Sequence, residues 1–322
     1  MTRLSRLASV FQNLAIPKTM NRLGSQLRVF GVALMASLSV VWFNMSGGLV
    51  KDAGGGASAS VEYLEAAVQR SPSPSSSQAA RRNALLVTQL YWIFGSKQQR
   101  GWYLYTPLIS RMIGSKPDPA SKDFASAVAR WQKKSGVAPS GVLDDDSLYK
   151  MIAEWQGKRI KDRTPAQPGQ VLTAPISDFY DPTREEELRK VERATYAAYK
   201  RLVAAAIADR SLGLARGSKK GELAPGEKYL KIISALRTRE YQEKLRRESP
   251  NSGSAGLAVN SPHFTGRALD LYVGGEPVDT LDSNRAVQVQ TRVYLWLVRN
   301  AERFGFRPYF YEPWHWEYVG EK

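Results

Sequence analysis

Apolar residues recur at helical spacing in two successive segments near the middle of the chain. In SKDFASAVARWQKKSG, four apolar residues lie at i, i+3, i+4 and i+7 and therefore share one face of a helix. They are Phe124, Ala127, Val128 and Trp131. The segment DDDSLYKMIAEW, residues 144–155, repeats this spacing. Serine and aspartate favour N-cap positions, so Ser121 predicts the start of the first helix and one of Asp144 to Asp146 the start of the second.

The C-terminal half alternates between helical patterns and short strand patterns. Helical spacing is found from Asp181 to residue 206, from 238 to 248 and, as one long helix, from 283 to 305. Three further segments are rich in β-branched or aromatic residues or alternate between apolar and polar positions. They are YLKIIS at 229–234, ALDLYV at 268–273 and FRPYFYEPWHWEYVG at 306–320. This order predicts an α+β domain with a small antiparallel sheet and flanking helices.

A long uncharged run near the N-terminus predicts a membrane segment. Residues 29–50 contain no charged side chain, whereas residues 1–28 contain five cations and no acid. As a helix the run would reach roughly 33 Å, enough to cross a hydrocarbon core of about 30 Å. We interpret it as a transmembrane anchor or a signal segment. The basic flank predicts a cytoplasmic N-terminal tail and an exported remainder.

Two low-complexity stretches and one proline-rich break divide the rest of the chain. GGGASAS and SPSPSSS have the composition of linkers, and TPAQPGQ at 164–170 separates two ordered regions. The predicted organisation is a basic cytoplasmic tail at 1–28, a transmembrane anchor or signal segment at 29–50, a flexible linker at 51–78, a small all-α domain at 79–163 and a catalytic domain at 164–322.

Composition excludes several kinds of chemistry. The 322 residues include no cysteine, which rules out disulfides, cysteine-ligated zinc, iron–sulfur clusters and thiol nucleophiles. Lysine and arginine total 46 against 30 acids, and residues 79–163 hold 15 of these cations against 7 acids. This excess fits solvated surface charge or attraction to an anionic polymer or a membrane surface. An exported chain rarely meets nucleic acid, so we expect no nucleic-acid partner.

The two histidines of the chain both lie in the C-terminal half, in SPHFTGRALD and EPWHWE. A zinc hydrolase needs three protein ligands, an open position for water and a carboxylate that takes the water proton. His263, Asp270 and His315 can supply the ligands, and either Glu312 or Glu317 the base. Imidazole and carboxylate ligands without cysteine favour zinc as the metal.

The segment AVARWQKKSGVAPSGVLDDDSL resembles the helical peptidoglycan-binding domain that accompanies many bacterial wall hydrolases. The resemblance is carried by small and aromatic residues at characteristic spacing: Ala127, Val128, Trp131, Gln132, Gly136, Gly141 and Ser147. It covers about 35 residues and implies a wall polymer as the partner of residues 79–163.

The two histidine motifs resemble those of the zinc D-alanyl-D-alanine carboxypeptidases and dipeptidases, including the vancomycin-resistance type. The wider group includes lysostaphin-type enzymes and the hedgehog signalling domain. The resemblance, over roughly 229–320, implies that His263, Asp270 and His315 bind Zn²⁺ and that Glu312 is the catalytic acid and base.

The same family carries an arginine after a short strand, which grips the terminal carboxylate of the substrate. ISALRTREYQ places Arg237 at that position and Gln242 at the expected distance, although Ala235 and Leu236 replace the family's usual glycine and tyrosine. Ser261 is expected to support the ligands or the substrate carboxylate. The resemblance implies substrate binding by Arg237, Gln242 and Ser261.

We therefore expect a zinc D,D-carboxypeptidase that trims D-alanine from peptidoglycan stem peptides. The expected place is the bacterial inner membrane, with a single span and the catalytic domain in the periplasm or wall, or secretion if the N-terminal segment is cleaved. An endopeptidase or a D-Ala-D-Ala dipeptidase would use the same site. A non-catalytic zinc module is a further alternative, against which Glu312 argues because a structural site needs no base.

Overall fold

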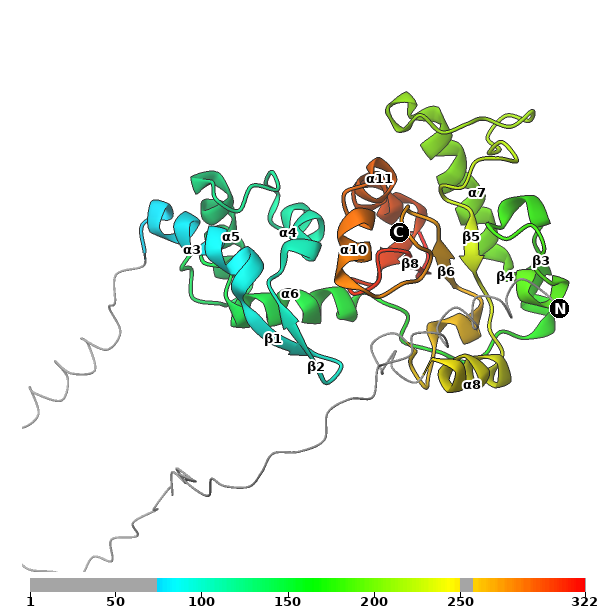
Figure 1. Ribbon diagram of the computed structural model, residues 1–322, viewed down its shortest axis with the longest axis horizontal. Coiled ribbons are helices and arrows are strands. Elements are labelled where there is room, and N and C mark those ends of the chain that lie inside the picture. The colour runs from blue at the N-terminus through cyan, green and yellow to red at the C-terminus, as the bar shows by residue number, and fades with distance from the viewer. Residues whose placement is uncertain (1–73, 250–256, 322) are drawn as a thin grey trace, which may run out of the picture. The chain divides into compact units, whose positions relative to one another are not determined.

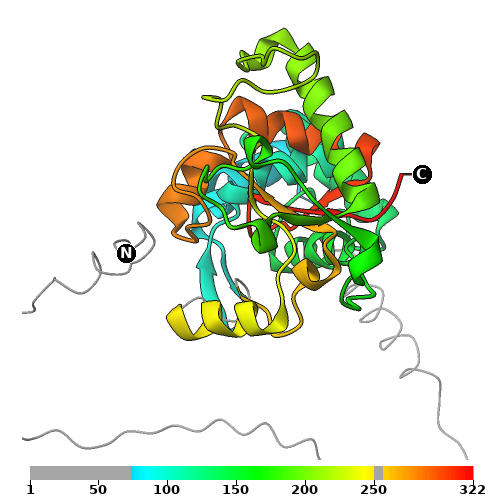
Figure 2. The same ribbon diagram turned by 90° about the vertical axis from the view of Figure 1, so that its right-hand side faces the viewer.

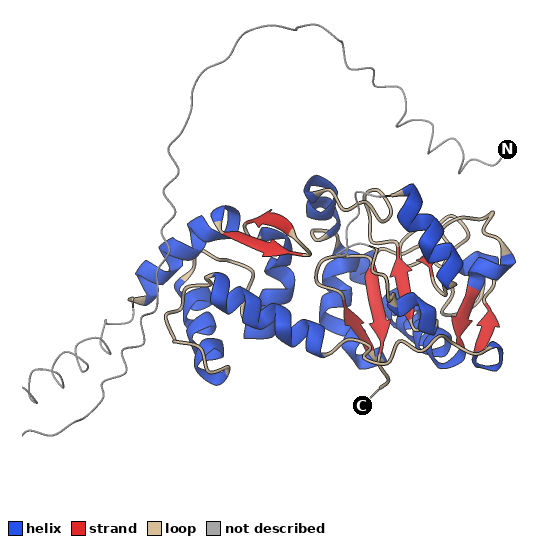
Figure 3. Cartoon of the chain, turned by 90° about the horizontal axis from the view of Figure 1, so that it is seen from below, coloured by secondary structure: helices blue, strands red, loops and turns tan. Residues whose placement is uncertain are grey.

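The computed structural model of the chain describes residues 74–249 and 257–321. The predicted cytoplasmic tail, the predicted membrane or signal segment and most of the predicted linker lie outside these residues. Among the helices that are described, none has both the length and the apolar character needed to cross a membrane. Helices make up much of the described chain, and the strands are short (Figure 3).

The first region is built from four helices, and the two predicted from sequence are both present. These helices are α3 Ser76–Gln89, α4 Thr106–Ile113, α5 Lys122–Lys134 and α6 Asp145–Gly157. The side chain of Ser121 caps α5 by accepting a hydrogen bond from the Phe124 amide, and Asp144 caps α6 in the same way. The four apolar residues predicted to share one face of α5 are all buried.

The expectation of an all-α first region is wrong at one place, where the chain forms a β-hairpin. Strands β1 Tyr91–Phe94 and β2 Lys97–Arg100 pair antiparallel. Gly95 and Ser96 connect them with φ angles of 56° and 63°. Two residues at positive φ form the tight turn that matches the twist of paired strands. The Gly-Ser dipeptide was the local signal for this hairpin.

Three residues of the motif that resembles a peptidoglycan-binding domain hold one loop in place. The buried Gln132 donates from Nε2 to the Val142 carbonyl at 2.9 Å and to Ser147 Oγ at 2.8 Å. Its Oε1 accepts from the Gly141 amide at 2.8 Å. Gly141 has a φ of +72°, and a Cβ there would lie 2.9 Å from the Ala125 carbonyl oxygen. These motif residues therefore stabilise the helical fold and are not available to a ligand.

A four-stranded antiparallel sheet forms the centre of the C-terminal half, as predicted. Its order is β5 Ile232–Ser234, β6 Ala268–Leu271, β8 His315–Tyr318 and β7 Phe306–Pro308 (Figure 1). Both faces of β6 are covered, so every residue of this strand is buried despite its alternating sequence. The register of β6 and β8 places Asp270 directly opposite His315.

Among the described residues of this half, the α-helices are α7 Arg193–Ala208, α8 Arg239–Glu248, α10 Asp282–Gln288 and α11 Arg292–Asn300. Helix α8 and the outer end of α7 lie at opposite ends of this half (Figure 1, Figure 2). The single helix predicted over 283–305 is wrong, because Thr291 caps a new helix by accepting from the Tyr294 amide.

The helix predicted to start at Asp181 begins later. The Glu192 carboxylate accepts from the amides of Ala194 and Thr195 and so caps α7 at this point. The preceding residues form a short 3-10 turn and strand β4 Lys190–Glu192, which pairs with β3 Val171–Thr173.

Aromatic side chains of the hairpin and of α6 pack against the C-terminal half. The rings of Phe94 and Trp155 lie with their centroids 4.7 and 5.8 Å from that of Phe310. Arg285 donates to the Tyr105 hydroxyl at 3.2 Å. The described residues fall within one compact unit, and their main apolar cluster includes residues of both halves.

Candidate metal centre and active site

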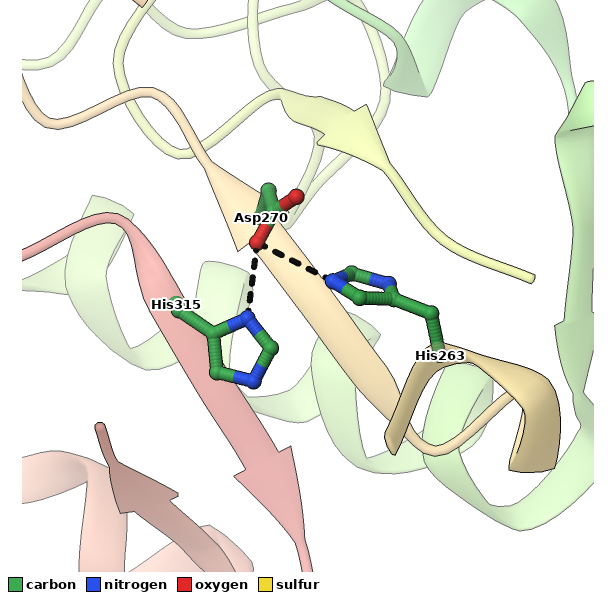
Figure 4. A group of neighbouring side chains, drawn as sticks. All are labelled: His263, Asp270 and His315. Carbon is green, nitrogen blue, oxygen red and sulfur yellow. Dashed lines mark hydrogen bonds and ion pairs between the residues drawn. The ribbon is translucent and has the colours of Figure 1, made fainter. Parts of the chain in front are cut away.

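Two histidines and one aspartate meet in the sheet at the centre of the C-terminal half. His263 lies in the short 3-10 helix Pro262–Thr265, Asp270 on β6 and His315 on β8 (Figure 4). Asp270 Oδ1 is 3.3 Å from His263 Nε2 and 2.9 Å from His315 Nδ1. One ligand atom from each residue lies within 4.8 Å of the others. All three side chains are buried. The short distances between them show that the structure brings together the predicted ligand set.

The remaining ring nitrogen of each histidine has a partner that fixes the direction of the ring. His263 Nδ1 lies 2.6 Å from the Ala235 carbonyl oxygen, and His315 Nε2 lies 3.2 Å from Glu317 Oε1. Partners of this kind orient metal-binding imidazoles in proteins. His263 Nε2 and His315 Nδ1 are thereby both turned toward Asp270 Oδ1. This donor set fits a divalent transition metal, and zinc in particular accepts two imidazoles and a carboxylate.

The three residues do not share the same charge. Burial lowers the pKa of His263 to about 4, and the nearby Arg237 acts in the same direction. Burial opposes ionisation of Asp270, but the charges of His263 and Arg237 outweigh it and hold its pKa well below the usual range. Burial also opposes the charge of His315, yet hydrogen bonds to Asp270 and Glu317 raise its pKa to about 9. A metal cation on the same atoms would take the place of the His315 proton.

Glu312 is the glutamate that faces the cavity beside this cluster. It lies in the turn before β8, where its amide donates to the Tyr309 carbonyl and its own carbonyl accepts from the His315 amide. Its Oε2 is 3.9 Å from His315 Nδ1. Burial raises the pKa of Glu312 to about 8, against the opposing effect of His315. A carboxyl group with a raised pKa near a metal site suits the transfer of a proton.

Glu317, the other glutamate that the sequence leaves open, lies behind the cluster. It is fully buried and does not line the cavity. Its Oε1 faces His315 Nε2, and its Oε2 accepts from the Ile160 amide at 2.8 Å. Burial opposes its charge, but the hydrogen bond from His315 and the Arg159 guanidinium lower the pKa of Glu317 to about 2. It is placed to orient a ligand and not to meet substrate.

The predicted carboxylate-binding residue Arg237 is held against the metal cluster. Its Nη2 lies 2.5 Å from Asp270 Oδ2, and its Nε donates to Ser234 Oγ at 2.9 Å. Its Nη1 donates to Gln242 Oε1 at 3.3 Å. Gln242 is buried and does not line the cavity, so its contact with the site is through Arg237. Ser261 lines the cavity, and its hydroxyl accepts from the His263 amide at 3.3 Å.

A cavity of about 500 Å³ opens over these residues, and both halves of the described chain line it. The hairpin contributes Phe94 and Gly95, and the end of α6 contributes Gln156. Clefts with a few converging polar groups are the usual place for small ligands. Sequence reasoning missed this contribution of the first region, because nothing local marks the hairpin as part of a site.

Arg159 is a second residue that sequence reasoning missed. Its Nε donates to Glu317 Oε1 at 2.9 Å, and its Nη2 also contacts this carboxylate oxygen. The guanidinium lies over the Tyr309 ring, 3.9 Å from its centroid. No pattern near Arg159 signals these contacts, since its partner is 158 positions away in the sequence.

A buried His/Asp/His cluster with a further carboxylate facing the same cavity is the arrangement of a metal-dependent hydrolase. Residues 189–321 match the family model of VanY, D-alanyl-D-alanine carboxypeptidase. The resemblance to this family that the histidine motifs indicate is therefore confirmed for these residues.

Comparisons of the whole chain add a solved structure. The structure of the LdcB LD-carboxypeptidase, described as revealing the molecular basis of peptidoglycan recognition, is 21% identical to this chain. The match covers 49% of this chain and 71% of that chain, with a TM-score of 0.34. No curated protein matches this sequence significantly.

Proposed function

We propose that the chain is a zinc-dependent D-alanyl-D-alanine carboxypeptidase that removes the terminal D-alanine from peptidoglycan stem peptides. The observation that carries this proposal is the position of Glu312, whose carboxylate lies 3.9 Å from His315 in the cavity over the His/Asp/His cluster. A metal site with such a carboxylate is built for hydrolysis, whereas a structural metal site has no use for one.

His263, Asp270 and His315 would hold the zinc ion, which supplies a Lewis acid for the scissile carbonyl and lowers the pKa of a bound water. Glu312 takes the proton of the attacking water at its carboxylate and gives it to the departing amine. Glu312 would be ionised at the start of the cycle if a cation occupied these ligands, because opposite charges stabilise each other in a buried site. Glu317 keeps the His315 ring in the orientation that turns Nδ1 toward Asp270.

A guanidinium beside the cluster supports an exopeptidase over an endopeptidase. An exopeptidase must bind the free carboxylate at the end of its substrate, whereas an endopeptidase meets an amide at the same position. Arg237 uses three nitrogens for contacts with the protein, but a guanidinium has five N–H donors. Its remaining donors are available to a carboxylate, with Gln242 keeping the guanidinium in place and Ser261 lining the same cavity.

The place of action follows from the substrate. Peptidoglycan lies outside the cytoplasm, so the enzyme acts there, and the predicted N-terminal segment at 29–50 would anchor it in the membrane or direct its secretion. The region at 79–163 would bind a wall polymer through its excess of cations. Gln132 and Gly141 are not part of that contact, because the fold already uses them.

Mass spectrometry of muropeptides tests the proposal. The purified full-length protein, loaded with zinc, is incubated with muropeptides that carry pentapeptide stems. Loss of one alanine supports the carboxypeptidase. Loss of a dipeptide, or splitting of a cross-linked dimer, assigns the site to a dipeptidase or an endopeptidase instead. Glu312→Gln is the matched control, and the proposal is wrong if neither protein changes any of these substrates.

A further inference from the structure

The cavity over the candidate metal site holds more positive charge than its carboxylates balance. Four arginines line it: Arg159, Arg163, Arg184 and Arg237. Arg159 forms an ion pair with Glu317, and Arg237 forms one with Asp270. In the part of the chain that the structure describes, neither Arg163 nor Arg184 forms an ion pair with a carboxylate.

The two unpaired guanidinium groups differ in their contacts. Arg163 Nη1 donates to the Asn260 carbonyl and is therefore held by the protein. The side chain of Arg184 makes no hydrogen bond to any described residue, and its Nε is buried without a partner. An unpartnered buried donor is costly, because it has lost water and gained nothing in return. Arg184 is the group in this cavity that most needs an acceptor.

Arg184 lies in a hydrogen-bonded turn at the wall of this cavity. Its amide donates to the Asp181 carbonyl at 3.2 Å, and the Asp181 side chain accepts from the Thr183 amide at 2.8 Å, so the turn is fixed. Burial lowers the pKa of Arg184, with Tyr241 raising it and Arg237 lowering it. Arg184 lines the same cavity as Arg237 and Asp270.

We propose that Arg184 is a substrate-binding residue that donates hydrogen bonds to the free C-terminal carboxylate of the peptide, together with the remaining donors of Arg237. A carboxylate accepts two parallel N–H bonds from one guanidinium and still has lone pairs for a second. The inference rests on the proposed exopeptidase function. It adds a residue outside the segment 189–321 that matches the family.

Kinetics on a matched pair of substrates test this assignment. One peptide ends in D-alanyl-D-alanine with a free carboxylate, and the other ends in the corresponding amide. In the full-length zinc protein, Arg184→Ala should lower kcat/KM on the acid by about 10- to 100-fold, mainly through KM, as expected for loss of a charge-assisted hydrogen bond. On the amide peptide, kcat/KM of Arg184→Ala should equal the low value of the wild type. Arg184→Lys should recover part of the loss, since it restores the charge but not the planar fork.

The control is Arg246→Ala, which removes the same charge from an exposed position on α8 that does not line the cavity. It should leave both substrates unaffected. The inference is overturned if Arg184→Ala slows the acid and the amide equally, or if it slows neither. Thermal unfolding of each variant shows whether the protein folds, and Arg184→Lys serves if the alanine variant does not.

A binding measurement separates this inference from the proposed function. Isothermal titration calorimetry measures the affinity of the Glu312→Gln variant for N-acetyl-D-alanine and for N-acetyl-D-alaninamide. The difference between the two affinities reports recognition of the carboxylate without turnover. If the acid binds through Arg184 but no stem peptide is cleaved, the function is wrong and the inference stands. If the wild type cleaves stem peptides but adding Arg184→Ala to the Glu312→Gln variant leaves its affinity for N-acetyl-D-alanine unchanged, the inference alone is wrong.

Discussion

Arg159 forms a buried ion pair with Glu317, a residue 158 positions further along the chain. Glu317 in turn lies 3.2 Å from His315 Nε2, the ring nitrogen that faces away from the candidate metal site. The end of the helical region is therefore connected to His315, a candidate metal ligand, through a single carboxylate. Glu317 is saturated by these contacts and by the Ile160 amide, which explains how a fully buried carboxylate keeps its charge.

Removing Arg159 should destabilise the protein and weaken its metal site. Arg159→Ala leaves Glu317 buried with an uncompensated charge, which costs about 3 to 5 kcal/mol for a buried pair. We expect a lower Tm and a lower affinity for zinc, measured by competition with a chelator. Arg201→Ala is the control, because its ion pair with Glu321 is exposed and should cost at most about 1 kcal/mol. Equal Tm values for the two variants would contradict this connection.

Substitution of the two glutamates near His315 should have different effects on activity and on zinc binding. Glu312→Gln removes the proton acceptor and should lower kcat by roughly a hundred- to ten-thousand-fold with little change in zinc content. Glu317→Gln removes the carboxylate that faces His315 Nε2. It should weaken zinc affinity by about 10- to 100-fold, the usual effect of losing a group that is hydrogen-bonded to a metal-binding histidine. Zinc content and kcat are measured on both variants. Loss of zinc from Glu312→Gln would contradict the role of Glu312 as proton acceptor. An inactive Glu317→Gln variant with normal zinc content would contradict the role of Glu317 in metal binding.

Removal of the metal should inactivate the enzyme reversibly and lower its Tm. A ligand that binds only the folded state stabilises it by about 4 kcal/mol at a thousand times its Kd. Dialysis against a chelator should therefore abolish cleavage, and added zinc should restore both activity and Tm. Asp270→Ala is the matched variant, because it removes the oxygen that both imidazoles face. Its Tm should not respond to zinc, and a normal response would argue against the site.

A chain that begins at residue 164 should be less stable than one that begins at residue 74. The shorter chain lacks both Arg159 and the Ile160 amide, so the Glu317 carboxylate loses two of its partners. It also lacks Phe94 and Trp155, which pack on Phe310. Unfolding in urea and zinc titration of the two chains measure the difference. Equal stability and equal zinc affinity would show that the C-terminal half is independent.

The sequence predicted that His263, Asp270 and His315 would lie together, because histidine is scarce in this chain. Only two histidines exist in the chain, and each lies within a specific motif, so His263 and His315 could be assigned from the sequence alone. The faces of α5 and α6 were also predicted correctly, since helical spacing and capping residues are local signals.

Interactions between distant residues could not be predicted in this way. The choice between Glu312 and Glu317 depends on which carboxylate the fold turns toward the cavity, and the path of the turn before β8 decides this. The partner of Glu317 is in another half of the chain, and Arg184 lies outside every motif. The start predicted for the helix at Asp181 was wrong, because the carboxylate of Glu192 caps the helix eleven residues later despite a favourable local pattern.

The fixed contact between Glu317 and the Arg159–Ile160 segment also limits how this protein can have evolved. A helical region could be exchanged freely between proteins only if it made no specific buried contact with the domain beside it. Here an exchanged module would have to bring both a guanidinium and a backbone amide to the same buried oxygens. We therefore expect the two halves to be inherited as a pair, with substitutions at position 159 compensated at position 317.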